Sequence, residues 1–197
     1  LLIGIVLSLV GGPTAVLVAL ALALVAAAQF QGTGTARWVW AAAGATLVLC
    51  NLALPLFRVP TTKGVKAEAM RLEQWNAFSR VTVDDTKTIK IDASAATHVE
   101  DLRALKPGLQ AREISALGHA IFSSPAGSAL VIGPGGGRDV LHALAAGTAH
   151  VTGVEVNPII AETIMKARYR ESSGGLYLDP RVTIVVGCSG SGKSTLC

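Results

Sequence analysis

The sequence predicts an α/β protein with N-terminal transmembrane helices, a small β-hairpin region and then a parallel sheet. Two long uncharged apolar stretches precede Arg58, apolar and polar residues alternate over 80–92, and a glycine-rich turn joins two apolar runs within 128–156. These patterns divide the chain into transmembrane helices over 1–57, a basic linker over 58–73, a hairpin and helix region over 74–127, and a partial α/β domain over 128–197.

The composition excludes several classes of protein. The chain is 51% hydrophobic and 15% charged, against roughly 25% charged in typical soluble domains. Its net charge of +4 comes without a basic face carrying interleaved aromatic residues, so we expect no nucleic-acid partner. The cysteines Cys50, Cys188 and Cys197 have neither the paired spacing of a zinc site nor that of a disulfide framework. The scattered histidines predict no metal site.

The first apolar stretch, "LLIGIVLSLVGGPTAVLVALALALVAAAQF", exceeds the roughly 20 apolar residues that a membrane span needs. Two readings are open: one long tilted helix, or the tail of one span ending at Val10, with "GGP" as a turn and Pro13 starting the next helix. A second span follows in "WVWAAAGATLVLCNLALPLF", with Trp38 and Trp40 at an interfacial position. The alternative is a very hydrophobic pair of core helices in a soluble protein.

Basic residues predict the orientation of these helices in the cell membrane. Positive residues remain on the cytoplasmic side of a bilayer. Four of them, Arg58, Lys63, Lys66 and Arg71, follow the second span, whereas only Arg37 precedes it. We therefore expect a lipid membrane as partner and a soluble domain that faces the cytoplasm.

The middle of the chain predicts a β-hairpin. Val81 and Val83 share one face of the first run and Ile89 and Ile91 one face of the second, with "DDT" between them. Before the hairpin, "RVPTTKGVKAEAMRLEQ" is a basic connector that leads into a predicted short helix. After it, "AREISALGHAIF" has its apolar residues at helical spacing.

The stretch after residue 127 predicts one strand–helix–strand unit of Rossmann type. "SALVIG" fits a buried parallel strand, and "HVTGVEV" fits a second one. Between them, "RDVLHALAAG" fits a helix that buries Val140, Leu141 and Leu144 and ends at Gly147. The crossover of such a unit is right-handed.

The glycines and one carboxylate of this unit predict a nucleoside site. Gly133, Gly135 and Gly137 allow a sharp turn and close approach of a ligand, and Gly136 adds freedom. Glu155 ends the second strand, where an acid accepts hydrogen bonds from both ribose hydroxyls of an adenine nucleoside. The structural alternative is a glycine-rich turn beside a solvated glutamate.

Arg138 stands where a dinucleotide site needs glycine, which favours S-adenosyl ligands. The run "ALVIGPGGGRDVLHALAAGTAHVTGVEVNP", followed by "GLYLDPRVTIVVG", resembles the spermidine synthase (polyamine aminopropyltransferase) branch of the S-adenosylmethionine-dependent transferases. The likeness extends from Gln74 to Gly187 and is strongest to membrane-anchored bacterial members, which implies the inner membrane.

The resemblance implies that the ligand is S-adenosylmethionine or its decarboxylated form. It also implies transfer of an aminopropyl or methyl group to a small-molecule amine, as in polyamine biosynthesis. Homo-oligomerisation stays open. Glu155 would hold the ribose, Val156 and Asn157 would flank the adenosine, and the loop from Gly133 to Gly137 would pass beside the ligand's tail. Gly136 stands where the family has an acid, for which Asp139 is the candidate substitute.

The family's catalytic aspartate follows a later strand than this sequence contains. We therefore assign no catalytic residue and expect the fragment to be inactive alone.

The C-terminal "GCSGSGKS" satisfies the phosphate-loop pattern. In that reading Gly187, Gly192, Lys193 and Ser194 would bind ATP or GTP with magnesium, but few residues follow for the required helix. A truncation or junction near residue 187 is the competing interpretation. A third hypothesis is a non-enzymatic membrane scaffold or sensor.

Overall fold

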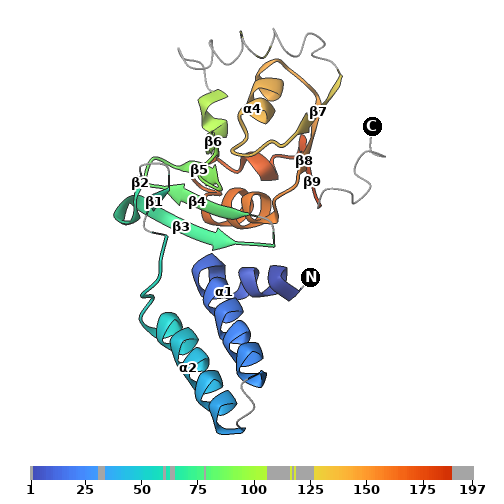
Figure 1. Ribbon diagram of the computed structural model, residues 1–197. Coiled ribbons are helices and arrows are strands. Elements are labelled where there is room, and N and C mark those ends of the chain that lie inside the picture. The colour runs from blue at the N-terminus through green and yellow to red at the C-terminus, as the bar shows by residue number, and fades with distance from the viewer. Residues whose placement is uncertain are drawn as a thin grey trace. The chain divides into compact units, whose positions relative to one another are not determined.

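The structure is a computed structural model (Figure 1). It describes residues 2–30, 34–59, 61–62, 65–77, 79–105, 116, 118 and 127–187. The helix expected over 111–122, apart from residues 116 and 118, and the phosphate loop after Gly187 lie outside these residues. The chain divides into two compact units, one of Leu1–Asp84 with Ile91–Ser94 and one of Asp85–Lys90 with Ala95–Cys197.

The first unit begins with two apolar helices, α1 (Leu2–Gln29) and α2 (Gly34–Ala53). Helix α1 is interrupted at Gly11, whose φ of 76° and ψ of 167° are not helical, and Pro13 follows directly. The interruption agrees with the reading in which "GGP" turns the chain. Both helices could cross a membrane by length and composition, and only 22% and 11% of their most apolar windows are buried.

Small residues bring α1 and α2 together. A Cβ on Gly44 would lie 2.8 Å from the Cβ of Ala21, so glycine allows the helices to approach closely. A buried hydrogen bond of 3.0 Å from Asn51 Nδ2 to Thr14 Oγ1 also joins the two helices. The Asn51 Oδ1 atom accepts the N–H of Phe57 at 2.7 Å, which fixes the start of the connector after α2.

Short strands and a 3₁₀ turn follow the connector. Strands β1 (Thr61–Thr62) and β2 (Val65–Lys66) form an antiparallel pair, and the 3₁₀ turn η1 (Ala67–Ala69) leads into the next strand. A larger sheet contains four strands in the order β3-β4-β5-β6. Their bounds are Met70–Trp75, Arg80–Asp84, Thr88–Ile91 and Ala95–His98.

The predicted hairpin corresponds to strands β4 and β5, and three of its apolar residues are buried. Val81, Val83 and Ile89 have no exposed surface. Of the short helix expected before the hairpin, the structure has only the 3₁₀ turn η1, and strand β3 follows it directly. Strand β3 pairs antiparallel with β4 and buries Leu72 in the sheet, and this pairing overrides the helix propensity of its residues.

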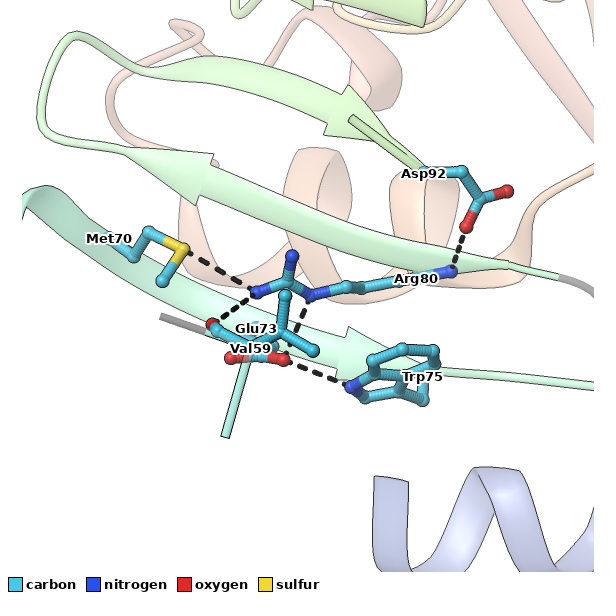
Figure 2. Close-up of polar contacts among 6 residues, drawn as sticks. All are labelled: Val59, Met70, Glu73, Trp75, Arg80 and Asp92. Carbon is cyan, nitrogen blue, oxygen red and sulfur yellow. Dashed lines mark hydrogen bonds and ion pairs between the residues drawn. The ribbon is translucent and has the colours of Figure 1, made fainter. Parts of the chain in front are cut away.

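A buried arginine joins several parts of the first unit (Figure 2). The side chain of Arg80 is 6% exposed, and its Nε donates to Glu73 Oε1 at 2.9 Å. Its Nη2 donates to the carbonyl of Val59 at 3.3 Å, and its guanidinium lies 5.8 Å from the ring centroid of Trp75. The backbone N–H of Arg80 donates to Asp92 Oδ1 at 2.8 Å. Arg80 thus ties the connector after α2 to the strands.

The interruption in α1 receives the indole ring of Trp75. A Cβ on Gly12 would overlap that ring, and a Cβ on Gly11 would lie 3.3 Å from its Cδ1 atom. The indole Nε1 donates to Glu73 Oε1 at 3.0 Å. The glycine pair therefore provides both the turn in α1 and the space for an aromatic side chain of β3.

The second unit contains a parallel sheet of three strands in the order β7-β8-β9. Strand β7 (Ser128–Ile132) is followed by α4 (Arg138–Ala145), β8 (His150–Glu155) and, later, β9 (Val182–Val186). Figure 1 shows these strands side by side. The predicted strand–helix–strand unit is therefore confirmed, and the fold is an α/β fold consistent with a truncated Rossmann-like sheet.

Helical segments form the core of the second unit against this sheet. Helix α4 buries Val140, Leu141 and Leu144 as expected, and Gly147 follows its end with a φ of 89°. After β8 come the π-helix η3 (Ile159–Arg168) and the 3₁₀ turn η4 (Leu176–Leu178), while the 3₁₀ turn η2 (Leu102–Leu105) precedes the sheet. The π-helix and η4 bury Ile160, Ala161, Ile164, Met165, Leu176 and Tyr177.

Candidate functional site

The turn after β7 requires glycine at defined positions. Gly133, Gly135 and Gly137 have φ angles of 68°, 53° and 95°, in the left-handed region that other residues rarely adopt. Gly137 precedes the first residue of α4, and its carbonyl accepts the N–H of Leu141 at 2.9 Å, the first bond of the helix. The turn thus carries the chain directly from a strand edge into a helix.

Neighbouring segments also pack tightly on the turn. A Cβ on Gly136 would overlap the carbonyl oxygen of His98 at the end of β6, and a Cβ on Gly137 would overlap the side chain of Leu176 in η4. At Gly135 a Cβ would lie 3.0 Å from Cγ2 of Thr97. Strand β6 and η4 therefore hold the glycine turn.

The amide groups of the turn donate to acceptors of the protein itself. Gly135 donates to Glu155 Oε2 at 3.1 Å, and Gly136 donates to Thr97 Oγ1 at 3.2 Å. Gly133 donates to the Val154 carbonyl at 2.9 Å, and Gly137 to the Pro134 carbonyl at 2.7 Å. An anionic ligand would have to displace one of these acceptors, so this arrangement is not an open phosphate cradle.

Glu155 lies at the carboxyl end of β8 and is only 5% exposed. Besides the Gly135 N–H on Oε2, its Oε1 accepts the N–H of Asn157 at 2.9 Å. The alternative of a solvated glutamate is therefore wrong. A carboxylate has about four lone-pair sites, so two acceptor positions remain, as many as the two hydroxyls of a ribose require.

A buried phenol completes this group of contacts. The hydroxyl of Tyr177 donates to the carbonyl of Gly135 at 2.7 Å, and the residue is 2% exposed. Burial raises the pKa of Tyr177 above its usual range, and the negative charge of Glu155 acts in the same direction. The phenol is therefore neutral at physiological pH and always carries the proton that it donates.

The other predicted binding residues differ in accessibility. Val156 is 39% exposed, whereas Asn157 is 2% exposed and its Oδ1 accepts the N–H of Ile159 at 3.1 Å, at the start of η3. The side chain of Asp139 is 60% exposed, and its Oδ1 lies 3.9 Å from His142 Nδ1. Among the described residues, the polar partner nearest to Asp139 is thus its own helix neighbour and not the glycine turn.

Of the alternative phosphate site, only Gly187 belongs to the described residues. Its N–H donates to the carbonyl of Glu155 at 3.2 Å, which continues the pairing of β8 and β9. Gly192, Lys193 and Ser194 lie outside the described residues. Among the described residues, no group of three or more His, Cys, Asp or Glu side chains could hold a metal ion.

Two exposed apolar side chains lie at the carboxyl edge of the parallel sheet. Ile132, the last residue of β7, is 80% exposed, and Val156 directly follows β8. Ile132 is paired with Val154, two residues before Val156.

Sequence reasoning missed three residues that hold the turn: Thr97, His98 and Tyr177. His98 contributes its backbone carbonyl, for which the sequence carries no signal. A weak signal existed for Tyr177, since it follows a Gly-Gly pair within the segment that resembles a known family. Nothing in the sequence distinguished Thr97.

No family model and no curated protein matches this chain. Among solved structures, the chain is similar to a spermidine synthase in complex with the transition-state analogue AdoDATO, at 16% identity and a TM-score of 0.43. The similarity covers 62% of this chain and 42% of that one, so the chain spans less than half the length of the solved enzyme.

Proposed function

We propose that the chain is the membrane-anchored part of a spermidine synthase-like transferase and binds S-adenosylmethionine or decarboxylated S-adenosylmethionine. The site lies at the carboxyl edge of β7 and β8. The observation that carries this proposal is the buried carboxylate of Glu155, which two backbone N–H groups hold in place at 2.9 and 3.1 Å. A buried carboxylate at this edge, with acceptor positions left, suits a ribose diol.

The remaining residues are assigned by their accessibility. Ile132 and Val156 offer apolar surface to the adenine. Gly133 is exposed, and no atom of the described residues lies within 4 Å of its Cβ position, which leaves space for the tail of the ligand at the exit of β7. Such a ligand supplies a carbon bonded to sulfonium that an amine attacks, and positioning accelerates this step. We assign no catalytic residue among the described residues.

The membrane part of the proposal rests on α1 and α2. Their exposed apolar side chains would face lipid, and the close contact at Gly44 and the Asn51–Thr14 hydrogen bond would hold the pair together there. Arg58, Lys66 and Arg71 follow α2, and by the positive-inside rule these basic residues support a cytoplasmic location for the second unit.

Replacing Glu155 by Gln is expected to weaken binding of S-adenosylmethionine by the full chain in lipid nanodiscs about 10-fold or more. Glutamine keeps the size but removes the charge, and a hydrogen bond to a charged group is worth roughly 1.5–3 kcal/mol. Isothermal titration calorimetry measures the change, with decarboxylated S-adenosylmethionine titrated in parallel.

The matched control is Glu162→Gln, an exposed carboxylate of η3 that pairs with Lys166 at 2.7 Å. It should leave affinity unchanged. Equal affinities for the parent and Glu155→Gln proteins would contradict the proposal. Magnesium-dependent ATP binding that disappears in Lys193→Ala would support the phosphate-loop alternative.

A further inference from the structure

We propose that Tyr177 is a positioning residue that fixes the peptide between Gly135 and Gly136 and thereby the direction of the Glu155 carboxylate. This inference deepens the proposed function and rests on it for its consequences in ligand binding. The structural part of the inference concerns the ligand-free protein: the hydroxyls of Tyr177 and Thr97 hold the peptide between Gly135 and Gly136. We call this arrangement the clamp.

The clamp holds one peptide group at both ends. The Gly135 carbonyl accepts the Tyr177 hydroxyl at 2.7 Å, and the Gly136 N–H of the same peptide donates to Thr97 Oγ1 at 3.2 Å. Glycine peptides rotate easily, because no Cβ restricts φ and ψ. The two hydroxyls bind opposite ends of this peptide. They therefore restrict the rotation of the peptide that the two glycines would otherwise allow.

The fixed peptide acts on Glu155 through the neighbouring amide. The N–H of Gly135 donates to Glu155 Oε2 at 3.1 Å, while Oε1 is held by Asn157. If the Gly135 residue rotates, this N–H leaves the carboxylate, and the two acceptor positions no longer point in fixed directions. Tyr177 would therefore affect the ribose site without contacting the ligand.

A purely structural role is the competing explanation, because the ring of Tyr177 also packs on the turn. Its Cε1 atom lies 3.5 Å from the Cβ position of Gly137. The substitution Tyr177→Phe separates the two roles, since it keeps the ring and removes only the hydroxyl. Tyr169→Phe is the matched control, because Tyr169 is the only other tyrosine in the chain.

The ligand-free test is amide hydrogen exchange of the full chain in nanodiscs. We expect Tyr177→Phe to accelerate exchange at Gly135 and Gly136 about 10-fold, with no change at Val154 in the centre of the sheet and no effect of Tyr169→Phe. Unchanged exchange at both glycines would overturn the inference, whether or not the chain binds any nucleoside.

The ligand-dependent test compares adenosine with 2′,3′-dideoxyadenosine by calorimetry. A neutral hydrogen bond is worth about 0.5–1.5 kcal/mol, so Tyr177→Phe should weaken adenosine binding about 3–10-fold and leave dideoxyadenosine binding unchanged. Equal losses for both ligands would contradict the positioning role. A third outcome is that the parent protein binds no nucleoside while Tyr177→Phe still accelerates amide exchange. That result would overturn the proposed function but support the structural role of Tyr177.

Discussion

Replacing Gly136 by Ala is expected to prevent the second unit from folding, at a cost of about 3 kcal/mol or more. The new Cβ would overlap the carbonyl oxygen of His98, which is a backbone atom and cannot move aside as a flexible side chain can. The Glu100 N–H also donates to the Gly136 carbonyl at 2.8 Å, so the two segments cannot separate without losing that bond. Thermal unfolding followed by circular dichroism measures the loss.

Gly133→Ala is the control for this prediction. No atom of the described residues lies within 4 Å of the Cβ position, and the cost is limited to the left-handed backbone, roughly 1–2 kcal/mol. Equal destabilisation by both substitutions would contradict the packing of β6 on the turn. Because any side chain at 136 meets the same carbonyl, this position has no room for an acidic side chain.

Arg80→Ala is expected to destabilise the first unit by about 2–4 kcal/mol. Removal of one partner of a buried ion pair costs about 3–5 kcal/mol, and the value is reduced here because the Glu73 side chain is 35% exposed. The substitution also leaves the Val59 carbonyl without the guanidinium donor and the Trp75 ring without its cation (Figure 2). Thermal unfolding of the full chain in nanodiscs provides the measurement.

Two further variants separate the charge of Arg80 from its packing. The double variant Arg80→Met with Glu73→Gln keeps the volume and removes both charges, so it should recover part of the lost stability. Arg103→Ala removes an exposed arginine that pairs with Asp101 at 2.7 Å, and it should leave the unfolding temperature unchanged. A loss for Arg103→Ala as large as for Arg80→Ala would refute the account of the buried cluster.

The sequence predicted those parts of the fold whose side chains follow a simple period. Alternation at Val81, Val83 and Ile89 predicted strands β4 and β5, and the apolar runs around the glycine turn predicted β7, α4 and β8. Strand β3 was missed because its residues favour helices and only pairing with β4 makes them a strand. Strand β6 has no alternating apolar residues, and three of its four residues are exposed.

The candidate site could be predicted only where its parts are close in sequence. The glycine turn and Glu155 lie within one strand–helix–strand unit, and their relation follows from its geometry. Thr97 and Tyr177 contact the turn from 39 and 42 residues away, through a strand edge and a 3₁₀ turn that have no motif. Sequence spacing likewise did not reveal that the amides of the turn donate to Glu155 and Thr97 rather than remaining open.

Nuclear magnetic resonance of the glycine- and asparagine-labelled chain tests the central proposal most directly. On titration with S-adenosylhomocysteine, the amide signals of Gly133, Gly135 and Asn157 should shift and saturate, whereas those of Gly44 in α2 and Gly175 beyond η3 should not move. Unchanged signals at the three site residues over a saturating range of ligand would contradict binding at the Glu155 edge.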